Sequence, residues 1–224
     1  MPPILDCVTG LVRRHEPFET MAMHRHSRPY AALVLDGGYE EHGPDGRFSC
    51  RTGRFIVHPA WHQHADSFSR HGAVVLNLPL EHAAELVFGK VADLAALESL
   101  ARRSPSEAGR ALAEEADVFE PRAPAPWLKK LVSMMIADEH STINDLAARC
   151  GVSPEHASRA CRRWYGLSPT RMRRESRIQH AIKLLRQGAS PSEAANEAGF
   201  SDQPHLTRLL KQATGRTPSK FRRH

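Results

Sequence analysis

The sequence lacks the features that mark membrane-spanning, secreted and disulfide-rich proteins. Its 224 residues contain no run near the ~20 apolar residues that a membrane helix needs. The opening Met-Pro-Pro-Ile-Leu-Asp has neither the basic lead nor the apolar core of a secretory signal. There are only four cysteines and no close Cys-x-x-Cys spacing: Cys7, Cys50, Cys150 and Cys161. We therefore expect a reduced, cytoplasmic protein with no membrane contact.

Positive charge is scarce in the first part of the chain and abundant in the second. Residues 1–126 hold 13 Lys and Arg against 17 Asp and Glu, a net charge of −4. Residues 127–224 hold 18 against 8, a net charge of +10. Such a surplus suits a polyanion, and nucleic acid is the commonest one in a cytosol. A merely solvated basic surface is the alternative.

The basic part contains a sequence pattern twice. The first copy is DLAARCGVSPEHASRACRRWYGLSP and the second is EAANEAGFSDQPHLTRLLKQATGRTP. Each combines a short helix, a Gly-centred turn and a longer helix that ends at Gly166 or Gly215. Ser153-Pro154 and Ser190-Pro191-Ser192-Glu193 carry helix N-cap chemistry. Both copies are therefore predicted helix-turn-helix units, with recognition helices at Ser153–Tyr165 and Ser201–Thr214.

The two longer helices are amphipathic. Apolar residues recur at i, i+3, i+4 and i+7 in both, so those faces should pack inward: Ala157, Ala160, Cys161 and Trp164, and Leu206, Leu209, Leu210 and Ala213. The opposite faces carry side chains that can hydrogen-bond bases or phosphates in a major groove. These candidate DNA-binding residues are Glu155, Ser158, Arg159, Arg162, Gln203, His205, Thr207, Arg208 and Lys211.

Residues 127–224 resemble the DNA-binding domain of AraC/XylS-type transcription regulators. The resemblance lies in WLKKLVSMMIADEH, INDLAARCGVSPEHASR, PTRMRRESRIQHAIKLLRQG and AANEAGFSD, followed by R-x-x-K-x-x-x-G-x-x-P-x-x-F-R at Arg208 to Arg222. It implies two helix-turn-helix units joined by one long helix, with both recognition helices in successive major grooves. Double-stranded promoter DNA is then the expected partner, and RNA polymerase a candidate one.

The acidic part resembles the small cupin-like sensory domain that precedes this DNA-binding domain in many such regulators. The resemblance lies in Met23-His24-Arg25-His26 and in Gly53-Arg-Phe-Ile-Val-His-Pro-Ala-Trp-His-Gln-His64. Short extended runs between Tyr30 and Leu78, separated at Asp36-Gly37-Gly38 and Gly43-Pro44-Asp45-Gly46, favour an antiparallel barrel. Ala, Leu and Glu dominate after Glu81, so residues 81 to about 117 should be helical.

The fold class predicted from these patterns is α+β with two domains. A cupin-like antiparallel barrel over residues 1–80 precedes a helical relay or dimerisation segment over 81–119. A linker with three prolines in seven residues, 120–126, leads to an all-α double helix-turn-helix domain over 127–224. The segment's apolar residues could pair two subunits in a homodimer or pack on their own barrel: Leu86, Val87, Val91, Leu94, Leu97, Leu100 and Leu112.

Nine of the fourteen histidines precede residue 83, which suggests that the barrel uses imidazole. His24 and His26 share one strand face because side chains alternate, and His64 could complete a three-nitrogen site for Zn²⁺ or Ni²⁺. His62 could replace His64, while His58 is less constrained. The Glu ligand of the cupin motif is absent, so the histidines could equally be polar interior or surface residues.

A small organic effector is the alternative to a metal ion. Tyr30, Phe55 and Trp61 would line its pocket together with the histidines, although Tyr30 and Trp61 could equally belong to the core. The sequence thus favours an effector-responsive regulator that is not an enzyme. A cupin metalloenzyme with a DNA-binding appendage and a constitutive regulator with a non-sensing dimerisation barrel are the rival interpretations.

Overall fold

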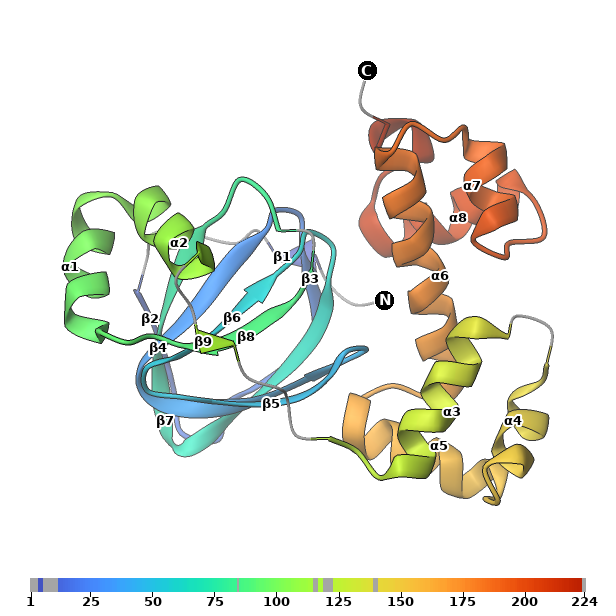
Figure 1. Cartoon of the computed structure of the whole chain (residues 1–224), viewed down its shortest axis with the longest axis horizontal. Helices are drawn as coiled ribbons and strands as arrows, with labels where there is room; N and C mark the ends of the chain where they lie inside the picture. Colours follow the sequence, from blue (N-terminus) through green and yellow to red (C-terminus); the bar gives the residue numbers. More distant parts are fainter. Residues whose placement is uncertain are drawn as a thin grey trace. The chain divides into compact units, whose positions relative to one another are not determined.

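The computed structural model describes residues 4–5, 12–83, 85–114, 117–118, 123–138 and 141–222. The chain divides into two compact units, residues 2–123 and residues 124–224, which we call the sheet unit and the helical unit. Figure 1 shows strands with two helices in the first and helices in the second. Among the described residues, no helix combines the length and apolar character needed to cross a membrane.

The described strands of the sheet unit form one nine-stranded sheet. Its order is β1-β3-β7-β4-β6-β8-β9, with β2 also paired to β7 and β5 to β4. All pairs are antiparallel except β1 with β3, which is parallel. The strands are β1 (Ile4–Leu5), β2 (Val12–His15), β3 (Thr20–His26), β4 (Tyr30–Gly43), β5 (Gly46–Arg51), β6 (Arg54–His58), β7 (Gln63–Pro79), β8 (Val87–Lys90) and β9 (Asp117–Val118).

Strand β4 continues through a segment where the sequence predicts a turn. The prediction of a break at Asp36-Gly37-Gly38 is wrong, because the register of the β4–β7 ladder shifts there without ending it. Gly37 adopts a left-handed φ of +70°, and a Cβ at this position would collide with the carbonyl oxygen of Gly72. The glycine therefore marks a bulge. The second predicted turn is confirmed, since Gly43 pairs with Gly46 at the β4–β5 hairpin.

The predicted helical segment, residues 81–119, is helical only in its middle. Helices α1 (Leu94–Arg103) and α2 (Pro105–Glu114) lie there, but β8 and β9 extend the sheet on either side of them. Val87 and Phe88 pair with Val57 and Ile56. β-Branched and aromatic side chains suit a strand, and this pairing outweighs the helical tendency of the surrounding Ala and Leu. The sheet unit therefore extends well past the predicted boundary at residue 80.

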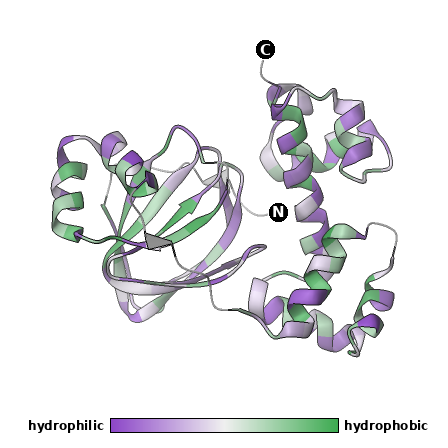
Figure 2. Cartoon of the chain, in the orientation of Figure 1, coloured by the Kyte–Doolittle hydropathy of each residue, from purple (hydrophilic) through white to green (hydrophobic). Residues whose placement is uncertain are grey.

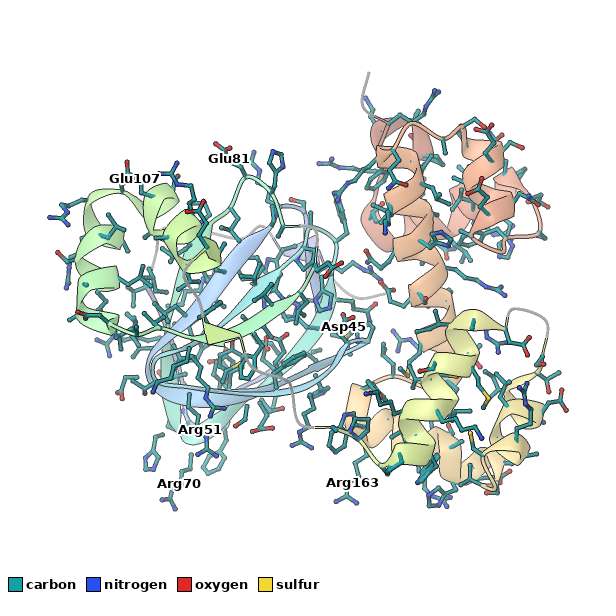
Figure 3. All side chains as sticks on the ribbon, viewed as in Figure 1. Asp45, Arg51, Arg70, Glu81, Glu107 and Arg163 are labelled. Atoms are coloured by element: carbon teal, nitrogen blue, oxygen red, sulfur yellow. The ribbon has the colours of Figure 1, made fainter. Side chains whose placement is uncertain are left out.

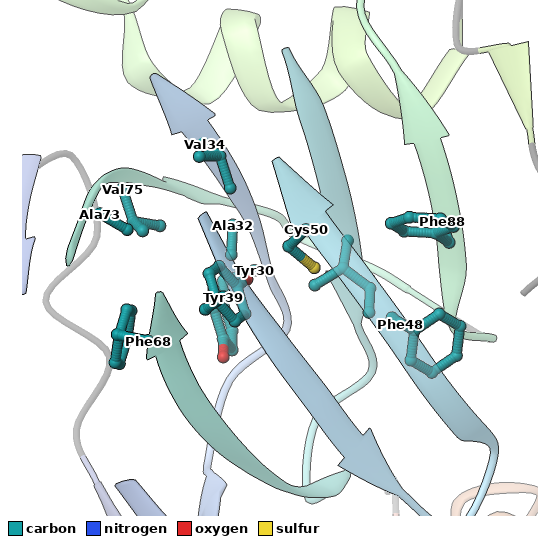
Figure 4. Packing of buried hydrophobic residues seen from close by; sticks show 11 residues of the cluster. Tyr30, Ala32, Val34, Tyr39, Phe48, Cys50, Phe68, Ala73, Val75 and Phe88 are labelled. Atoms are coloured by element: carbon teal, nitrogen blue, oxygen red, sulfur yellow. The ribbon is translucent and has the colours of Figure 1, made fainter. Parts of the chain in front are cut away.

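Two apolar cores lie on opposite faces of the sheet. Alternate residues of β4 belong to different cores, as strand geometry requires. One core contains Tyr30, Val34, Phe48 and Phe88, seen in Figure 4. The other joins the sheet to the two helices through the residues Ala31, Leu33, Phe55, Val57, Leu76, Leu78, Leu97, Ala101, Ala108 and Leu112.

The apolar residues proposed for dimerisation are used within the sheet unit itself. Leu97 and Leu112 are buried in the second core, and Leu94 and Leu100 pack against it. The side chain of Leu86 packs against the first core. Packing against the chain's own sheet, the alternative considered above, is therefore what the structure shows for this segment.

The helical unit contains six α-helices and a 3₁₀ turn among its described residues. Hydrophobic and hydrophilic residues alternate along these helices, as Figure 2 shows. The elements are α3 (Pro126–Ala137), α4 (Ile143–Arg149), α5 (Pro154–Tyr165), α6 (Pro169–Arg186), α7 (Pro191–Glu197), α8 (Gln203–Thr214) and η1 (Pro218–Lys220). Of the predicted linker, residues 120–122 lie outside the described residues, and Pro126 already begins α3. The described cysteines, Cys50, Cys150 and Cys161, are free.

The predicted helix ends of the two copies are confirmed by their caps. Ser190 and Glu193 form a reciprocal capping box at the start of α7. Gly166 and Gly215 close α5 and α8 with φ values of 70° and 71°. One start is corrected: α8 begins at Gln203 after the N-cap Asp202, two residues later than predicted.

Helix α6 joins the two copies. We call α4 with α5 the first copy and α7 with α8 the second copy. The buried side of α6 includes Met172, Ile178, Ile182 and Leu185, and the helix contacts α3, α5, α7 and α8. Arg173 ties α6 to α3 and to the segment before α4, because its guanidinium donates to the carbonyl oxygens of Met135 (3.3 Å) and Ser141 (2.9 Å).

Candidate DNA-binding helices and a histidine-lined hollow

Helices α5 and α8 carry matching polar residues at matching distances from their N-caps. The N-caps are Ser153 and Asp202, whose side-chain oxygens accept from the backbone N–H three residues later. Because the two helices start and end alike, residues 49 apart are structurally equivalent. The matched polar pairs are His156 with His205, Ser158 with Thr207, Arg159 with Arg208, and Arg162 with Lys211.

The inward faces of the two helices differ in size. Ala157 and Cys161 are fully buried in the first copy, and Leu206 and Leu210 occupy the equivalent positions in the second. Ala213 is buried as well, whereas Ala160, Trp164 and Leu209 are half-buried. The prediction of inward-facing apolar stripes is confirmed for the buried members. The same scaffold is thus packed with small side chains in one copy and with leucines in the other.

The sheet unit gathers histidines and carboxylates through cross-strand pairing. His24 of β3 lies opposite His64 of β7 in the ladder. Glu41 of β4 lies opposite Asp66 of β7 in the same way. Directly opposite residues have neighbouring side chains. All four side chains are buried, and they line a small hollow of about 50 Å³ together with His26 and Tyr30.

The predicted histidine triad comes together in this hollow. One nitrogen from each of His24, His26 and His64 lies within 4.8 Å of the others. Nδ1 of His24 donates to the carbonyl oxygen of Ala22 at 3.0 Å, which leaves its Nε2 without a proton in the neutral ring. The Tyr30 hydroxyl lies 3.2 Å from Nε2 of His64. Hydrogen bonds that orient imidazoles in this way are typical of metal ligands.

Burial shifts the pKa values of these groups in the direction that favours their neutral forms. It lowers the pKa of His24, and it lowers those of His58 and His64 well below the ordinary value; neighbouring imidazoles lower all three further. Burial also raises the pKa of Glu41 to about 8, and burial beside Glu41 raises that of Asp66 well above its usual range. Neutral imidazoles are ready to act as ligands, and a cation would reverse the shifts of the carboxyl groups.

Three residues of this neighbourhood were missed or undervalued by the sequence argument. His58 is 1% exposed, and its Nε2 lies 3.3 Å from Oε2 of Glu41, so the prediction that it is less constrained than the other histidines is wrong. Glu41 and Asp66 provide carboxylates beside His64, although the cupin motif has none in its usual slot. The sequence argument missed Glu41 because it predicted a turn at Gly37. The structure has a bulge there instead, and β4 continues through it to Glu41.

The predicted effector pocket is not formed as described. Tyr30 faces the histidine hollow, but Phe55 belongs to the other face of the sheet, under α1 and α2. Trp61 is 2% exposed in the β6–β7 loop, with a left-handed φ of 71°, and its carbonyl oxygen accepts from the buried Arg25 at 3.0 Å. Of the three predicted pocket residues, only Tyr30 lines the hollow with the histidines.

One comparison with known families falls within the helical unit. A family model described as a helix-turn-helix domain matches residues 146–224. The arabinose operon regulatory protein of Salmonella typhimurium is 34% identical over 92 residues, which cover 41% of this chain and 33% of that protein. An uncharacterised helix-turn-helix transcriptional regulator of Bacillus subtilis, YbfI, is 41% identical over 68 residues, which cover 30% of this chain and 25% of that protein. The matches therefore span a quarter to a third of these relatives.

A solved structure is similar to part of the chain. It is that of an AraC-type transcriptional regulator from Chromobacterium violaceum, 30% identical, with 43% of this chain and 89% of that chain covered and a TM-score of 0.41. The helical unit is therefore similar to the helix-turn-helix domains of AraC-type regulators.

The helical unit exposes most of the residues predicted to contact DNA. Glu155, Arg159, Arg162, Gln203, Arg208 and Lys211 are exposed, and Ser158, His205 and Thr207 are half-buried. Within the described part of the chain, neither Arg159 nor Arg208 forms an ion pair. The pKa of Glu155 is lowered by its own backbone N–H, by the Ser153 hydroxyl and by nearby Arg159.

One predicted contact residue is also held inside the domain. Nδ1 of His205 lies 2.9 Å from the hydroxyl oxygen of Ser201, and its ring packs edge-on against Phe200. In the first copy, the ring of the equivalent His156 lies 5.1 Å from that of Trp127 of α3. Both histidines are therefore oriented by neighbours at the start of their helices.

Proposed function

We propose that this chain is a DNA-binding transcription regulator whose helical unit binds double-stranded DNA through two helix-turn-helix units. The observation that carries this proposal is the repeated pattern of exposed polar residues on α5 and α8. An arginine stands six residues after the N-cap in both helices, and a second cation stands nine residues after it.

The chemistry of these positions suits a major groove. Arg159 and Arg208 can each donate two parallel hydrogen bonds to a guanine edge, which is the commonest specific contact to DNA. Arg162 and Lys211 suit phosphate oxygens, which fix the orientation of a helix on the duplex. The net charge of +10 over residues 127–224 supplies the attraction to the polyanion. The two recognition helices would then enter successive major grooves, about 10 base pairs apart.

We propose further that the sheet unit, with a cupin-like arrangement, is the sensor. Its hollow of about 50 Å³ is far smaller than the roughly 300–1,000 Å³ of pockets for organic ligands. A metal ion with a bound water suits this volume better. The donor set of three buried imidazoles at His24, His26 and His64 fits Zn²⁺ or Ni²⁺. When bound, such an ion would supply a fixed positive charge. The binding energy of the ion could then bias the conformation of the regulator.

A second function has one observation in its favour. The buried carboxyl pair of Glu41 and Asp66 beside His64 is the kind of group that a cupin metalloenzyme could use for proton transfer. A sensor needs no such acid or base. Substrate turnover by the metal-loaded chain, lost on Glu41→Gln, would favour the enzyme. A homodimer, and contact of the regulator with RNA polymerase, remain predictions.

The test is a binding selection with the full chain. Duplexes selected from a random library should share two short motifs about one helical turn apart, and footprinting should show protection of both. Titration of a selected duplex with and without a chelator then separates sensing from constitutive binding. We expect the chelator to change the affinity. Enrichment of no sequence would refute specific DNA binding, and equal affinity with and without chelator would favour the constitutive regulator.

A further inference from the structure

A second group of histidines lies beside the predicted triad. His58 ends strand β6, and His62 follows in the loop that leads to β7. One nitrogen from each of His58, His62 and His64 lies within 4.8 Å of the others. These residues are buried, with His62 at 8% exposure the most accessible of the three. The cupin resemblance assigns no role to His58 or His62.

We propose that His58 and His62 bind a divalent cation through their Nδ1 atoms, with His64 as the third ligand and Glu41 and Asp45 as outer partners. The site would accept a metal that prefers imidazole, such as Zn²⁺ or Co²⁺, and would leave a fourth position for water.

The spacing of the two Nδ1 atoms is the first argument. They face each other at 3.5 Å, beyond the 2.7–3.2 Å range of ordinary N–H hydrogen bonds. Two nitrogens bound to one tetrahedral zinc ion, each at about 2.0–2.1 Å, stand about 3.3 Å apart. The observed separation is therefore close to that required for an ion between the rings.

The outer nitrogens supply the second argument. Nε2 of His62 lies 2.6 Å from a carboxylate oxygen of Asp45, which can only accept while ionised, so Nε2 carries the proton and Nδ1 of the neutral ring is an acceptor. Nε2 of His58 lies 3.3 Å from Oε2 of Glu41. The hydrogen bond of His62 to Asp45 matches a recurrent arrangement, in which an imidazole lies between a metal ion and a carboxylate that orients the ring and raises its basicity.

The loop that carries His62 is held in place before any ion binds. The buried Arg25 donates to the Trp61 carbonyl oxygen at 3.0 Å and to Gln63 Oε1 at 2.6 Å. The backbone N–H of Trp61 donates to the carbonyl oxygen of His26 at 2.8 Å. These bonds fix the residues on both sides of His62, so the loop needs little further ordering when an ion binds.

An entry route is present at Asp45. The side chain of this residue is 54% exposed in the turn between β4 and β5, where Figure 3 labels it. A cation could therefore reach His62 from solvent along a carboxylate. The predicted triad shares only His64 with this site, so variants of His24 and of His62 distinguish the two locations.

The experiment is a Co²⁺ titration of the full chain after removal of metal by chelation, followed by visible absorption and by competition with Zn²⁺. We expect His62→Gln to weaken Co²⁺ binding more than tenfold and Asp45→Asn to weaken it about 10- to 100-fold. His24→Gln, the same change in the other triad, removes a ligand of that triad and should alter the affinity of the His58–His62 site less than twofold. Asp45→Asn lies in an exposed turn and serves as the readout if His62→Gln disturbs folding, which circular dichroism reports.

Three outcomes would overturn the proposal. One is the absence of saturable Co²⁺ binding by the wild-type chain. Another is a weakening of Co²⁺ binding at the His58–His62 site in the His24→Gln variant as large as that in the His62→Gln variant. The third is an unchanged affinity in both His62→Gln and Asp45→Asn. The inference rests on the proposed sensing role only for its biological meaning. The titration contains no DNA, so its failure and the failure of DNA binding are separate results.

Discussion

The two units of this chain place their chemically active side chains in opposite locations. In the sheet unit, His24, His58, His64 and Glu41 are each no more than 2% exposed. In the helical unit, Arg159, Arg162, Arg208 and Lys211 are exposed, and Figure 3 shows arginines such as Arg163 extending from its surface. A buried polar group needs a partner small enough to enter, whereas an exposed cation can meet a macromolecule. The difference supports the proposal of a small ligand for one unit and DNA for the other.

The largest expected effects are on stability, and they come from shortening one buried side chain in each unit. Leu33 and Leu210 are both fully buried, so Leu33→Ala and Leu210→Ala should each lower the free energy of unfolding of their own unit by about 2–5 kcal/mol. Amide hydrogen exchange, resolved by segment, should show faster exchange only in the unit that carries the change.

The exposed Ile136 of α3 offers a matched control. At 57% exposure, Ile136→Ala should change stability by less than about 0.5 kcal/mol. Faster exchange in β4 and β7 after Leu210→Ala would break the comparison, because it would mean that the two units unfold together.

The next effect concerns DNA. Arg159→Ala and Arg208→Ala should each weaken binding to a selected duplex by about 1–3 kcal/mol and leave most of the binding to random duplex. Fluorescence anisotropy at one fixed salt concentration measures both.

Arg110→Ala is the control for lost charge, since Arg110 is exposed on α2 of the sheet unit. Its effect on the selected duplex should be small. If Arg208→Ala weakened random and selected duplexes equally, Arg208 would be a phosphate contact, and the proposed base reading would be wrong.

The smallest expected effect is on the stability of the helix caps, and it allows the first and second copies to be compared. Thr142 and Ser190 form equivalent capping boxes with Asp145 and Glu193, so Thr142→Ala and Ser190→Ala should each cost about 1 kcal/mol of stability. Urea denaturation of the full chain measures the loss.

Ser192→Ala is a suitable control, because this exposed serine lies one residue inside α7 and caps nothing. A cost for Ser190→Ala with none for Thr142→Ala would show that the two copies differ in stability at their caps as well as in their inward faces.

The helical unit was largely predictable because its determinants are local. A cap and the N–H groups that it satisfies are three residues apart, and the left-handed glycines at residues 166 and 215 end helices by their own backbone freedom. Even there, the sequence misplaced the start of α8, because Ser201 and Asp202 are both good caps and only the structure shows that Asp202 is used.

The sheet unit was predictable only in outline. Turn residues predicted the β4–β5 hairpin, but the bulge at Gly37 was mistaken for a turn and β8 for part of a helix. Each error concerns a strand whose partner is distant in the sequence. Val87 is a strand residue because Val57 lies opposite it, and no local pattern contains that information.

By itself, the sequence determined the two opposite charges, the repeated helix-turn-helix pattern and the presence of His24 and His26 on one strand face, because these depend on composition or on residues within a few positions of one another. Only the tertiary structure decided that Glu41 lies beside Asp66, that Phe55 is separated from Tyr30, and that Nδ1 of His58 faces Nδ1 of His62. The physical reason is register: one shifted residue in a ladder moves every later side chain to the other face.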